Sequence, residues 1–590
     1  MKNIFFFISL LFCFHAGFSQ DFDAYDKNWA TYFGGQGTRF TTSVIDSEGN
    51  LIAMANILGD VSSILEDEEY YNQFITTQDP QFTYNSNLAT GFNDQTLVAK
   101  FSPEGDLLKA VYLPFYVYKI NIDANDHIFI SGFSEESGLG TPDAWFPNPH
   151  DELVNLFDKT ILAKLNLDFS TQWLTYTPTN GAVFDFALDD DGNFYGVSYT
   201  NIQTGITTPN TFQPNFMVQE NSEEQRNGYF FKLNHLGELQ WASYYGFTTP
   251  GSLAYDGNAE IIGSFKAPVL AQYEDYYLTA DAYQQTPTQQ VISKFNTNTG
   301  QRSYSTYLDD TLLITSFTFY NNFIYCSAYV FNTLIDDNLI SPDAYQTSHG
   351  GMLDVYLGKF TSRFTPIWGT YMGGSEIDYN NLESEEIRVK NDAIYITGIT
   401  GSNGFINSTN TYQSTLAGSS DIFMMKFSLD GELTWGSYFG GNEGENYSSI
   451  SVVNDSIFYL VGDTFSLENI STPESHQEEV NFHPSTTSGY NMGNGYIAKF
   501  GPEEGLSIGD VLWKDDFSVY PNPSIGKVNI VGNSQTPIEY IEVFSATGKT
   551  VLEKEVSNLE EHQLDLSFLA KGVYFLKVNH AASAKKLILK

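Results

Sequence analysis

Trp29-Ala30-Thr31-Tyr32-Phe33-Gly34-Gly35 is the stretch on which the prediction of the fold depends, because close copies of it recur along the chain. It returns near the other end as Trp435 to Gly441, and related peptides lie at Trp241 to Gly246, Tyr304 to Leu308 and Trp368 to Gly374. A peptide that returns at long, regular intervals indicates one supersecondary unit that is copied many times.

Three further strand-like segments accompany this one, which we call strand d. Strand a alternates apolar and polar residues up to an acidic turn, strand b follows at once, and strand c ends in a Lys-aromatic or Lys-Leu pair. Turns such as Asp189 to Asn193 (a–b) and Leu429 to Glu432 (c–d) are typical of tight hairpins. The pair that ends strand c occurs seven times, 62 to 73 residues apart, at Lys100-Phe101, Lys164-Leu165, Lys232-Leu233, Lys294-Phe295, Lys359-Phe360, Lys426-Phe427 and Lys499-Phe500.

A second recurring segment, often with Pro, an aromatic residue and Gln, lies before strand c in the middle copies. Its members are Pro142 to Trp145, Pro209 to Gln213, Ala280 to Gln284, Pro342 to Gln346 and Asn410 to Gln413. Three kinds of segment that recur in one order over most of the chain indicate a single repeated architecture.

Four strands in each of seven units predict an all-β fold, namely a seven-bladed β-propeller over residues 20–501, which closes radially and leaves few exposed sheet edges. An open β-solenoid is the alternative. Trp29 to Gly35 is a d strand with no other strand before it, whereas the last copy ends at Lys499-Phe500 without a d strand. We therefore expect Trp29 to Phe33 to pair beside Tyr496 to Phe500 and to complete the seventh blade.

The repeats resemble the secreted SBBP β-propeller repeats. Tyr304-Ser305-Thr306-Tyr307-Leu308 and Ala282-Tyr283-Gln284 match that pattern closely, whereas Leu107 to Leu113 and Ser475-His476-Gln477 depart from it. The resemblance covers most of the chain and implies a secreted propeller, but it carries no defined activity.

The chain is acidic and aromatic, with a net charge of −43, 17% charged residues and 16% aromatic residues. This combination predicts a folded protein, because disorder requires low hydrophobicity as well as charge. So acidic a protein repels nucleic acid. Solubility in an external medium and cation binding are the two interpretations of the acidity.

Residues 1–19 are predicted to be a secretory signal peptide, with Lys2, the apolar run Ile4 to Phe14, and Gly17 and Ser19 before a cleavage site at Gln20. The apolar run is too short to span a bilayer, and no later stretch is long enough for a transmembrane segment. Cleavage would remove Cys13 and leave Cys326, so a redox-active cysteine pair is excluded.

The tail differs in charge from the rest of the chain. Residues 502–516 are predicted to be a linker, and residues 517–590 hold eight Lys and seven acidic residues. Seven strand-like runs suggest a small β-sandwich: 517–520, 527–531, 538–544, 550–555, 562–566, 573–578 and 585–589.

The tail closely resembles the type IX secretion C-terminal sorting domain, type A. The residues that carry this resemblance are Tyr520-Pro521-Asn522-Pro523, Gly526, Gly548-Lys549, Asp565-Leu566-Ser567, Gly572-Val573-Tyr574 and Lys585 to Lys590. The resemblance implies export in Bacteroidetes-like bacteria through the type IX machinery, which residues 517–590 would engage, and removal of the tail with release or surface attachment. An Ig-like binding module is the alternative.

No catalytic, cofactor-binding or metal-binding residue is assigned from the sequence. Calcium at the loops between strands d and a is a possibility, and the acids there are Asp309, Asp310, Glu376, Asp378, Glu443 and Glu445. Asp189-x-Asp191-x-Asn193 is better explained as a hairpin, and His476 and His483 lack the spacing of a helical zinc site. Trp145 and Phe146 are candidates for stacking on a sugar, with burial as the alternative.

Long b–c connections, at about 60–96, 134–159 and 200–228, favour a binding site on the face where they emerge. We expect a secreted or cell-surface protein that binds an extracellular glycan or protein. An extracellular propeller enzyme that acts on polysaccharide or phosphate esters at the channel mouth is the alternative, and a structural spacer is a third.

Overall fold

The structure is a computed structural model in which the chain separates into two compact units, Met1–Gly505 and Leu506–Lys590. It describes residues 25–57, 66–77, 79–88, 95–153, 159–183, 185–219, 225–331, 337–379, 387–484, 493–502, 517–522, 524–532, 538–545, 549–559, 561–579 and 585–590. The predicted signal peptide, residues 503–516 of the predicted linker, and Pro523 and Gly548 of the tail motifs lie outside the described residues.

Seven consecutive antiparallel sheets, numbered here along the chain, make up the described part of the first unit. Sheet 1 consists of β2(Thr38–Ile45), β3(Leu51–Ile57), β4(Thr96–Phe101) and β5(Leu107–Leu113). Sheet 2 consists of β6(Tyr116–Ile122), β7(Ile128–Phe133), β8(Thr160–Leu165) and β9(Thr171–Tyr176). Sheet 3 consists of β10(Phe186–Leu188), β11(Phe194–Thr200), β12(Asn227–Leu233) and β13(Leu239–Tyr245).

Sheets 4 and 5 consist of β14(Thr249–Tyr255), β15(Glu260–Lys266), β16(Gln290–Asn296) and β17(Arg302–Leu308), and of β18(Leu312–Tyr320), β19(Phe323–Phe331), β20(Leu353–Thr361) and β21(Pro366–Met372). Sheet 6 consists of β22(Asp378–Tyr379), β23(Ile387–Lys390), β24(Ala393–Thr400), β25(Asp421–Ser428) and β26(Leu433–Phe439), and both β22 and β23 pair with β24. Sheet 7 consists of β27(Glu445–Asn454), β28(Ile457–Thr464), β29(Asn494–Gly501) and β1(Asp26–Gln36).

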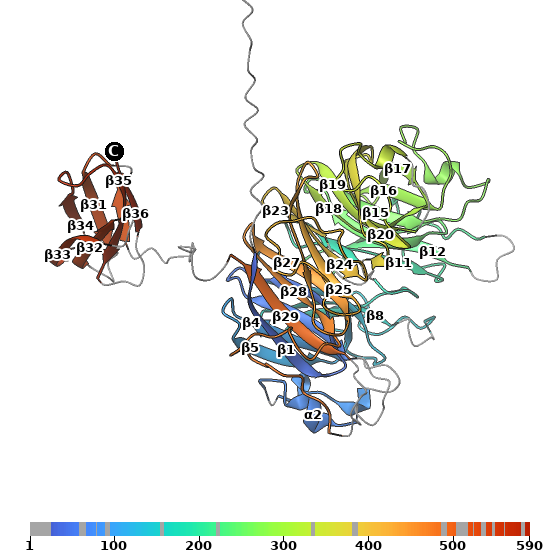
Figure 1. Ribbon diagram of the computed structural model, residues 1–590. Helices are drawn as coiled ribbons and strands as arrows, with labels where there is room; N and C mark the ends of the chain where they lie inside the picture. The colour runs from blue at the N-terminus through green and yellow to red at the C-terminus, as the bar shows by residue number, and fades with distance from the viewer. Residues whose placement is uncertain are drawn as a thin grey trace, which may run out of the picture. The chain divides into compact units, whose positions relative to one another are not determined.

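The prediction for the N-terminal strand is confirmed. β1 pairs with β29 in antiparallel register, with Trp29 opposite Lys499 and Tyr32 opposite Tyr496. In Figure 1 this blue strand lies beside the orange-red β29. The first and last segments of the unit therefore share one sheet.

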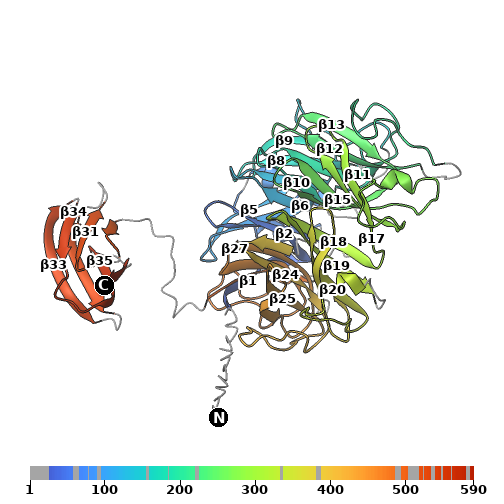
Figure 2. The ribbon, with the colours of Figure 1, turned by 90° about the horizontal axis from the view of Figure 1, so that it is seen from above.

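The apolar core is divided among the interfaces of successive sheets, which we call junctions. One cluster of buried side chains lies at each of junctions 1/2, 2/3, 3/4, 4/5, 5/6 and 6/7, and another joins sheet 7 to sheet 1. Figure 2 shows the colours passing in order around the unit until orange β27 lies beside blue β2, and these two strands are in contact. Strands β3 and β24 are buried along their whole length, because sheets cover both of their faces. The arrangement is propeller-like.

The second recurring segment of the sequence covers the outer edge of the sheets. In sheets 2 to 7 a backbone N–H of this segment donates to a Ser or Thr hydroxyl of strand d, as Gln346 N–H does to Thr370 Oγ1 at 2.9 Å. The next residue of strand d donates its own N–H to the carbonyl of the same segment residue, as Tyr371 does to Gln346 O at 3.1 Å. We call these stretches edge segments; the residues that make the contact are Phe146, Gln213, Gln284, Gln346, Gln413 and Gln477. An unpaired strand edge is a template for unwanted pairing, so these segments protect the rim.

The helices of the described residues are short and lie in connections between strands: α2(Glu68–Asn72), η1(Pro80–Phe82), η2(Ser86–Leu88), η4(Asp275–Tyr277) and η5(Asp337–Leu339). No helix among the described residues has the length and apolar character needed to cross a membrane.

The second unit contains two sheets that share one core, and this confirms the predicted β-sandwich. They are β30(Phe517–Tyr520), β31(Lys527–Gly532) and β34(Glu561–Asp565), and β32(Ile538–Ser545), β33(Thr550–Leu559), β35(Gly572–Val578) and β36(Lys585–Leu589). Ile530 and Leu564 of the first sheet pack in one cluster with Ile541 and Leu576 of the second. All seven predicted strands are present.

Candidate functional site

A repeated contact between neighbouring sheets builds the site. Near the start of strand d, a Trp side chain donates its indole N–H to a carbonyl in the c–d turn of the next sheet, as Trp368 Nε1 does to Leu429 O at 3.0 Å. Tyr304 and Lys109 make the same contact where Trp is absent, to Arg363 O (2.7 Å) and Asp168 O (2.6 Å). Trp29 extends it to the closing junction, where its Nε1 donates to Pro103 O of sheet 1 at 3.0 Å.

The Gly in the c–d turn belongs to this contact. Gly431 has a φ of +87°, and a Cβ added there would lie 3.0 Å from the Trp368 ring. Gly105 stands in the same relation to Trp29. The Trp of strand d and the Gly of the c–d turn, which recur at separate places in the sequence, are thus in contact across a junction.

Junction 6/7 departs from the rule because sheet 7 receives its outer strand from β1 and has no c–d turn. Trp435 Nε1 donates instead to Asn410 O, at 2.9 Å. Tyr25 fills the place of the missing turn, with its ring 4.9 Å from the Trp435 ring.

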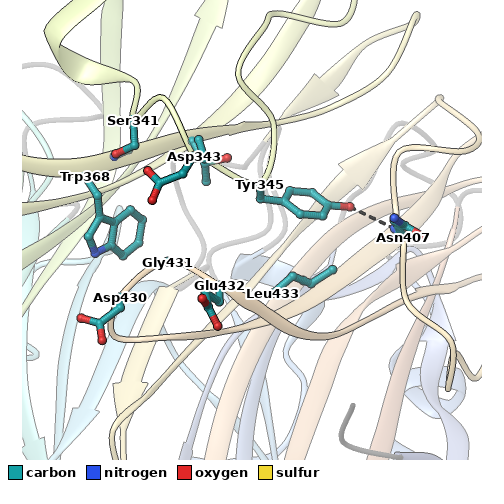
Figure 3. Close-up of a pocket in the computed structure, with 12 residues that line it drawn as sticks. Ser341, Asp343, Tyr345, Trp368, Asn407, Asp430, Gly431, Glu432 and Leu433 are labelled. Carbon is teal, nitrogen blue, oxygen red and sulfur yellow. Dashed lines mark hydrogen bonds between the residues drawn. The ribbon is translucent and has the colours of Figure 1, made fainter. Parts of the chain in front are cut away.

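A pocket of about 490 Å³ lies at junction 5/6 (Figure 3). It is formed by an edge segment and strand d of sheet 5, and by the c–d turn and a b–c loop residue of sheet 6. The lining residues are Ser341, Asp343, Ala344, Tyr345, Trp368, Gly369, Thr370, Asn407, Asp430, Gly431, Glu432 and Leu433. Its volume is in the range of about 300–1,000 Å³ that is usual for small-molecule sites.

Two aromatic side chains, both partly buried, form the walls of this pocket. Trp368 is fixed by its bond to Leu429 O and by contact with Gly431. Tyr345 Oη accepts the N–H of Asn407 at 3.0 Å, as Figure 3 shows, and its ring packs 5.8 Å from the Phe427 ring. These contacts hold both rings in place without a ligand.

The rim carries three carboxylates, those of Asp343, Asp430 and Glu432 (Figure 3). The Asp430 side chain is 93% exposed. Lys359 lies beneath the turn, where its Nζ donates to Leu429 O at 3.0 Å and lies 4.0 Å from Asp430 Oδ1. No Lys, Arg or His is among the twelve lining residues.

A second, more open pocket of about 620 Å³ lies where the b–c and d–a loops of sheet 4 meet. Tyr283, 39% exposed, and Asp309 and Asp310 are among its lining residues. Asp310 Oδ1 accepts the N–H of Gln290 at 3.1 Å, and Asp309 Oδ1 that of Thr311 at 2.8 Å. Both carboxylates therefore already brace their loop.

Of the d–a loop acids that the sequence suggested for calcium, Asp378 and Glu445 are buried and occupied. Glu445 Oε1 accepts the hydroxyls of Thr464 and Ser466, both at 2.7 Å, and Asp378 Oδ2 accepts that of Ser402 at 2.8 Å. Burial raises the pKa of Glu445 to about 7 and also raises the pKa of Asp378. These acids fasten strand a to strand b, and the described residues contain no group of three or more His, Cys, Asp and Glu that could hold a metal ion.

Asp189, in the other acidic motif, builds a hairpin. Its Oδ1 accepts the N–H of Asp191 and of Asn193, at 3.1 and 2.9 Å, in the turn between β10 and β11.

The two His residues considered for zinc have different surroundings. The His476 ring packs 5.5 Å from the Phe33 ring, and burial lowers its pKa. His483 Nε2 lies 3.1 Å from Asp67 Oδ2.

Trp145 and Phe146 belong to the edge segment of sheet 2 and pack against the core at junction 2/3. Both side chains are partly buried in this contact. Arg39, in strand a of sheet 1, lies over the ring of Tyr447, in strand a of sheet 7, at 3.9 Å. It also pairs with buried Asp463 at 3.3 Å. Burial raises the pKa of Asp463 to about 6.

Sequence reasoning missed the pocket at junction 5/6, although it recognised both segments that form it. The edge segment at Pro342 to Gln346 and the turn at Leu429 to Glu432 are 83 or more positions apart in the sequence. The Trp contact is one of those that bring them together, and its signal was the joint recurrence of Trp in strand d and Gly in the c–d turn.

Comparison with known proteins gives one family match, to the secretion system C-terminal sorting domain over residues 518–590. No curated protein sequence matches the chain. Among solved structures, a protein of unknown function from Dyadobacter fermentans DSM 18053 is similar, with a TM-score of 0.36 and 8% identity over 81% of this chain and 99% of that one.

Two further structures are similar at the same level. A catalytically inactive virginiamycin B lyase from Staphylococcus aureus, with quinupristin, has a TM-score of 0.36 and 7% identity over 80% of this chain and 98% of that one. The Dos1 propeller has a TM-score of 0.34 and 6% identity over 81% and 95%. Likeness at this level assigns no activity. The match of the tail to the sorting domain indicates that the protein is exported by the type IX secretion system to the cell surface or the medium.

Proposed function

We propose that the first unit is a closed seven-bladed β-propeller and that the protein is an extracellular binding protein. The proposed organisation is a signal peptide at 1–19, the propeller at 20–501, a linker at 502–516 and the sorting domain at 517–590. The core cluster that joins sheet 7 to sheet 1, and the Trp29 contact with Pro103, support closure.

The observation that carries the binding function is the pocket at junction 5/6. Rigid aromatic walls with a few convergent polar groups are the usual composition of a ligand site. Trp368 and Tyr345 offer flat apolar faces, and Ser341, Thr370 and Asn407 offer hydroxyl and amide groups. This composition suits an extracellular glycan, whose rings have an apolar face and hydroxyl edges.

A glycan array with the purified full chain tests the proposal, with Ala344→Trp as the blocking variant because Ala344 lines the pocket. Ala282→Trp is the matched control, since Ala282 has the same position in the edge segment of sheet 4 and does not line either pocket. We expect at least tenfold weaker binding with Ala344→Trp and unchanged binding with Ala282→Trp, both with wild-type melting temperatures. No binding by the wild type, or equal loss in both variants, would contradict a site in this pocket.

A further inference from the structure

Junctions 4/5 and 5/6 place different charges at equivalent positions. In sheet 5 the N–H of Thr361 donates to Thr365 O, and in sheet 6 that of Ser428 donates to Glu432 O, both at 2.9 Å. The third residue of each turn is therefore equivalent, and it is Arg363 in sheet 5 and Asp430 in sheet 6.

The facing edge segments are equivalent too. Ala282 N–H donates to Thr279 O, and Ala344 N–H donates to Ser341 O, both at 3.1 Å, so Asp281 and Asp343 share one position. At junction 4/5 the guanidinium of Arg363 pairs with Asp281. At junction 5/6 Asp343 and Asp430 line one pocket together with Glu432, and the lining itself contains no cation. Lys359, outside the lining, lies 4.0 Å from Asp430 Oδ1 while its Nζ donates to Leu429 O.

Resting on the binding function proposed above, we infer that the ligand of this pocket is an amino sugar whose protonated amine takes the place that the Arg363 guanidinium has at junction 4/5. An ammonium group close to carboxylates gains charge-assisted hydrogen bonds, and it gains further from the face of a Trp or Tyr ring. The sugar ring accounts for the rest of the lining, because its apolar face fits the indole of Trp368 and its hydroxyls fit Ser341, Thr370 and Asn407.

Two other cations fit the pocket less well. A metal ion needs ligands that converge within coordination distance, and no such group occurs among the described residues. A lysine side chain is a thin methylene chain and would leave most of the approximately 490 Å³ unfilled.

Isothermal titration calorimetry of the full chain with a glucosamine oligosaccharide and its N-acetylated counterpart of equal length tests the inference. We expect the free amine form to bind at least tenfold more tightly at pH 6, and its affinity to fall as salt is raised. Asp430→Arg restores the charge pattern of junction 4/5 and should weaken binding of the amine form at least tenfold, while leaving the acetylated form within twofold.

Asp343→Asn and Asp143→Asn are a matched pair, because both Asp residues are exposed and follow Pro in an edge segment, and only Asp343 lines the pocket. We expect Asp343→Asn to weaken binding of the free amine form and Asp143→Asn to leave it unchanged. Equal affinity for both sugars, or no effect of Asp430→Arg, overturns the amine while leaving pocket binding intact. If neither glucosamine form binds in the titrations while neutral glycans bind on the array, the amine is likewise overturned and pocket binding stands. If no glycan binds on the array, the binding function itself is contradicted. Oligolysine that binds more tightly than the amino sugar would reassign the pocket to a protein ligand.

Discussion

Junctions 4/5 and 5/6 have the same construction and different chemistry. At both, a ring from strand d bonds to a carbonyl of the next turn, Tyr304 to Arg363 and Trp368 to Leu429. At junction 4/5 the side chain of Arg363 pairs with Asp281, whereas at junction 5/6 a carboxylate stands in its place beside an open pocket. The bond between the strand-d ring and the turn carbonyl is thus independent of the charge of the exposed turn residue. A repeat can therefore acquire a pocket while it keeps this bond.

The strongest test of the shared contact removes it where the unit closes. Deletion of Trp29 to Phe33 takes away three buried aromatic side chains and the pairing of β1 with β29. We expect the free energy of unfolding to fall by more than the roughly 3–5 kcal/mol that truncation of one buried Trp costs. Thermal melts measure this, and a synthetic peptide of residues 26–36 should restore the melting temperature. An unchanged melt would show that closure does not depend on β1.

A buried carboxylate near the neighbouring junction 6/7 should make the stability depend on pH. Folding raises the pKa of Glu445 from 4.5 to about 7, so the folded state holds the proton more tightly than the unfolded chain. The contribution of Glu445 to stability is therefore fully present below pH 4.5 and is lost as the pH rises to about 7, by an amount on the order of 3 kcal/mol. Denaturant melts from pH 4.5 to 8 measure the slope. Glu445→Gln should flatten it, and an equal slope in that variant would assign it to other groups such as Asp463.

The packing of Trp368 on the turn gives a smaller effect. Gly431→Val forces a side chain against the indole, in addition to the strain at a φ of +87°. Gly257→Val, at a φ of +72° with no atom within 4 Å of the added Cβ, carries the backbone strain alone. We expect Gly431→Val to cost about 1–3 kcal/mol more in unfolding free energy, as overpacking usually does. Equal costs would mean that the Trp contact tolerates displacement.

Exchange of the two charges should have the smallest effect on stability. Arg363 and Asp281 are 60% and 48% exposed, so Arg363→Asp should lower the free energy of unfolding by less than about 1 kcal/mol. Asp430→Arg should raise it by a similar amount, and both changes should shrink in 0.5 M salt. Urea titrations compare them. Shifts of the same sign would disprove the equivalence of the two positions.

The strands and the strand exchange at the closing sheet could be predicted, because hydrophobic alternation, turn residues and repeat order are properties of neighbouring residues. The Lys-aromatic pairs end the c strands as expected, and Trp29 to Phe33 lies beside Tyr496 to Phe500. The role of the edge segments could not be predicted, since Gln346 acts through strand d of its own sheet more than 20 residues away. The pocket depends on four separate segments. The burial of Asp378 and Glu445 could not be predicted either, because nothing local shows that Ser402 and Ser466 bond to them.

The pairing of β1 with β29 has a consequence for the time order of folding. β1 is made among the first residues of the first unit, and among the described strands it pairs with β29 alone, the last strand of that unit. During synthesis and export β1 therefore has no strand to pair with until β29 has been made and exported. Completion of sheet 7 is then a single late event, and anything that holds β1 back, such as a bound chaperone, would keep that sheet incomplete.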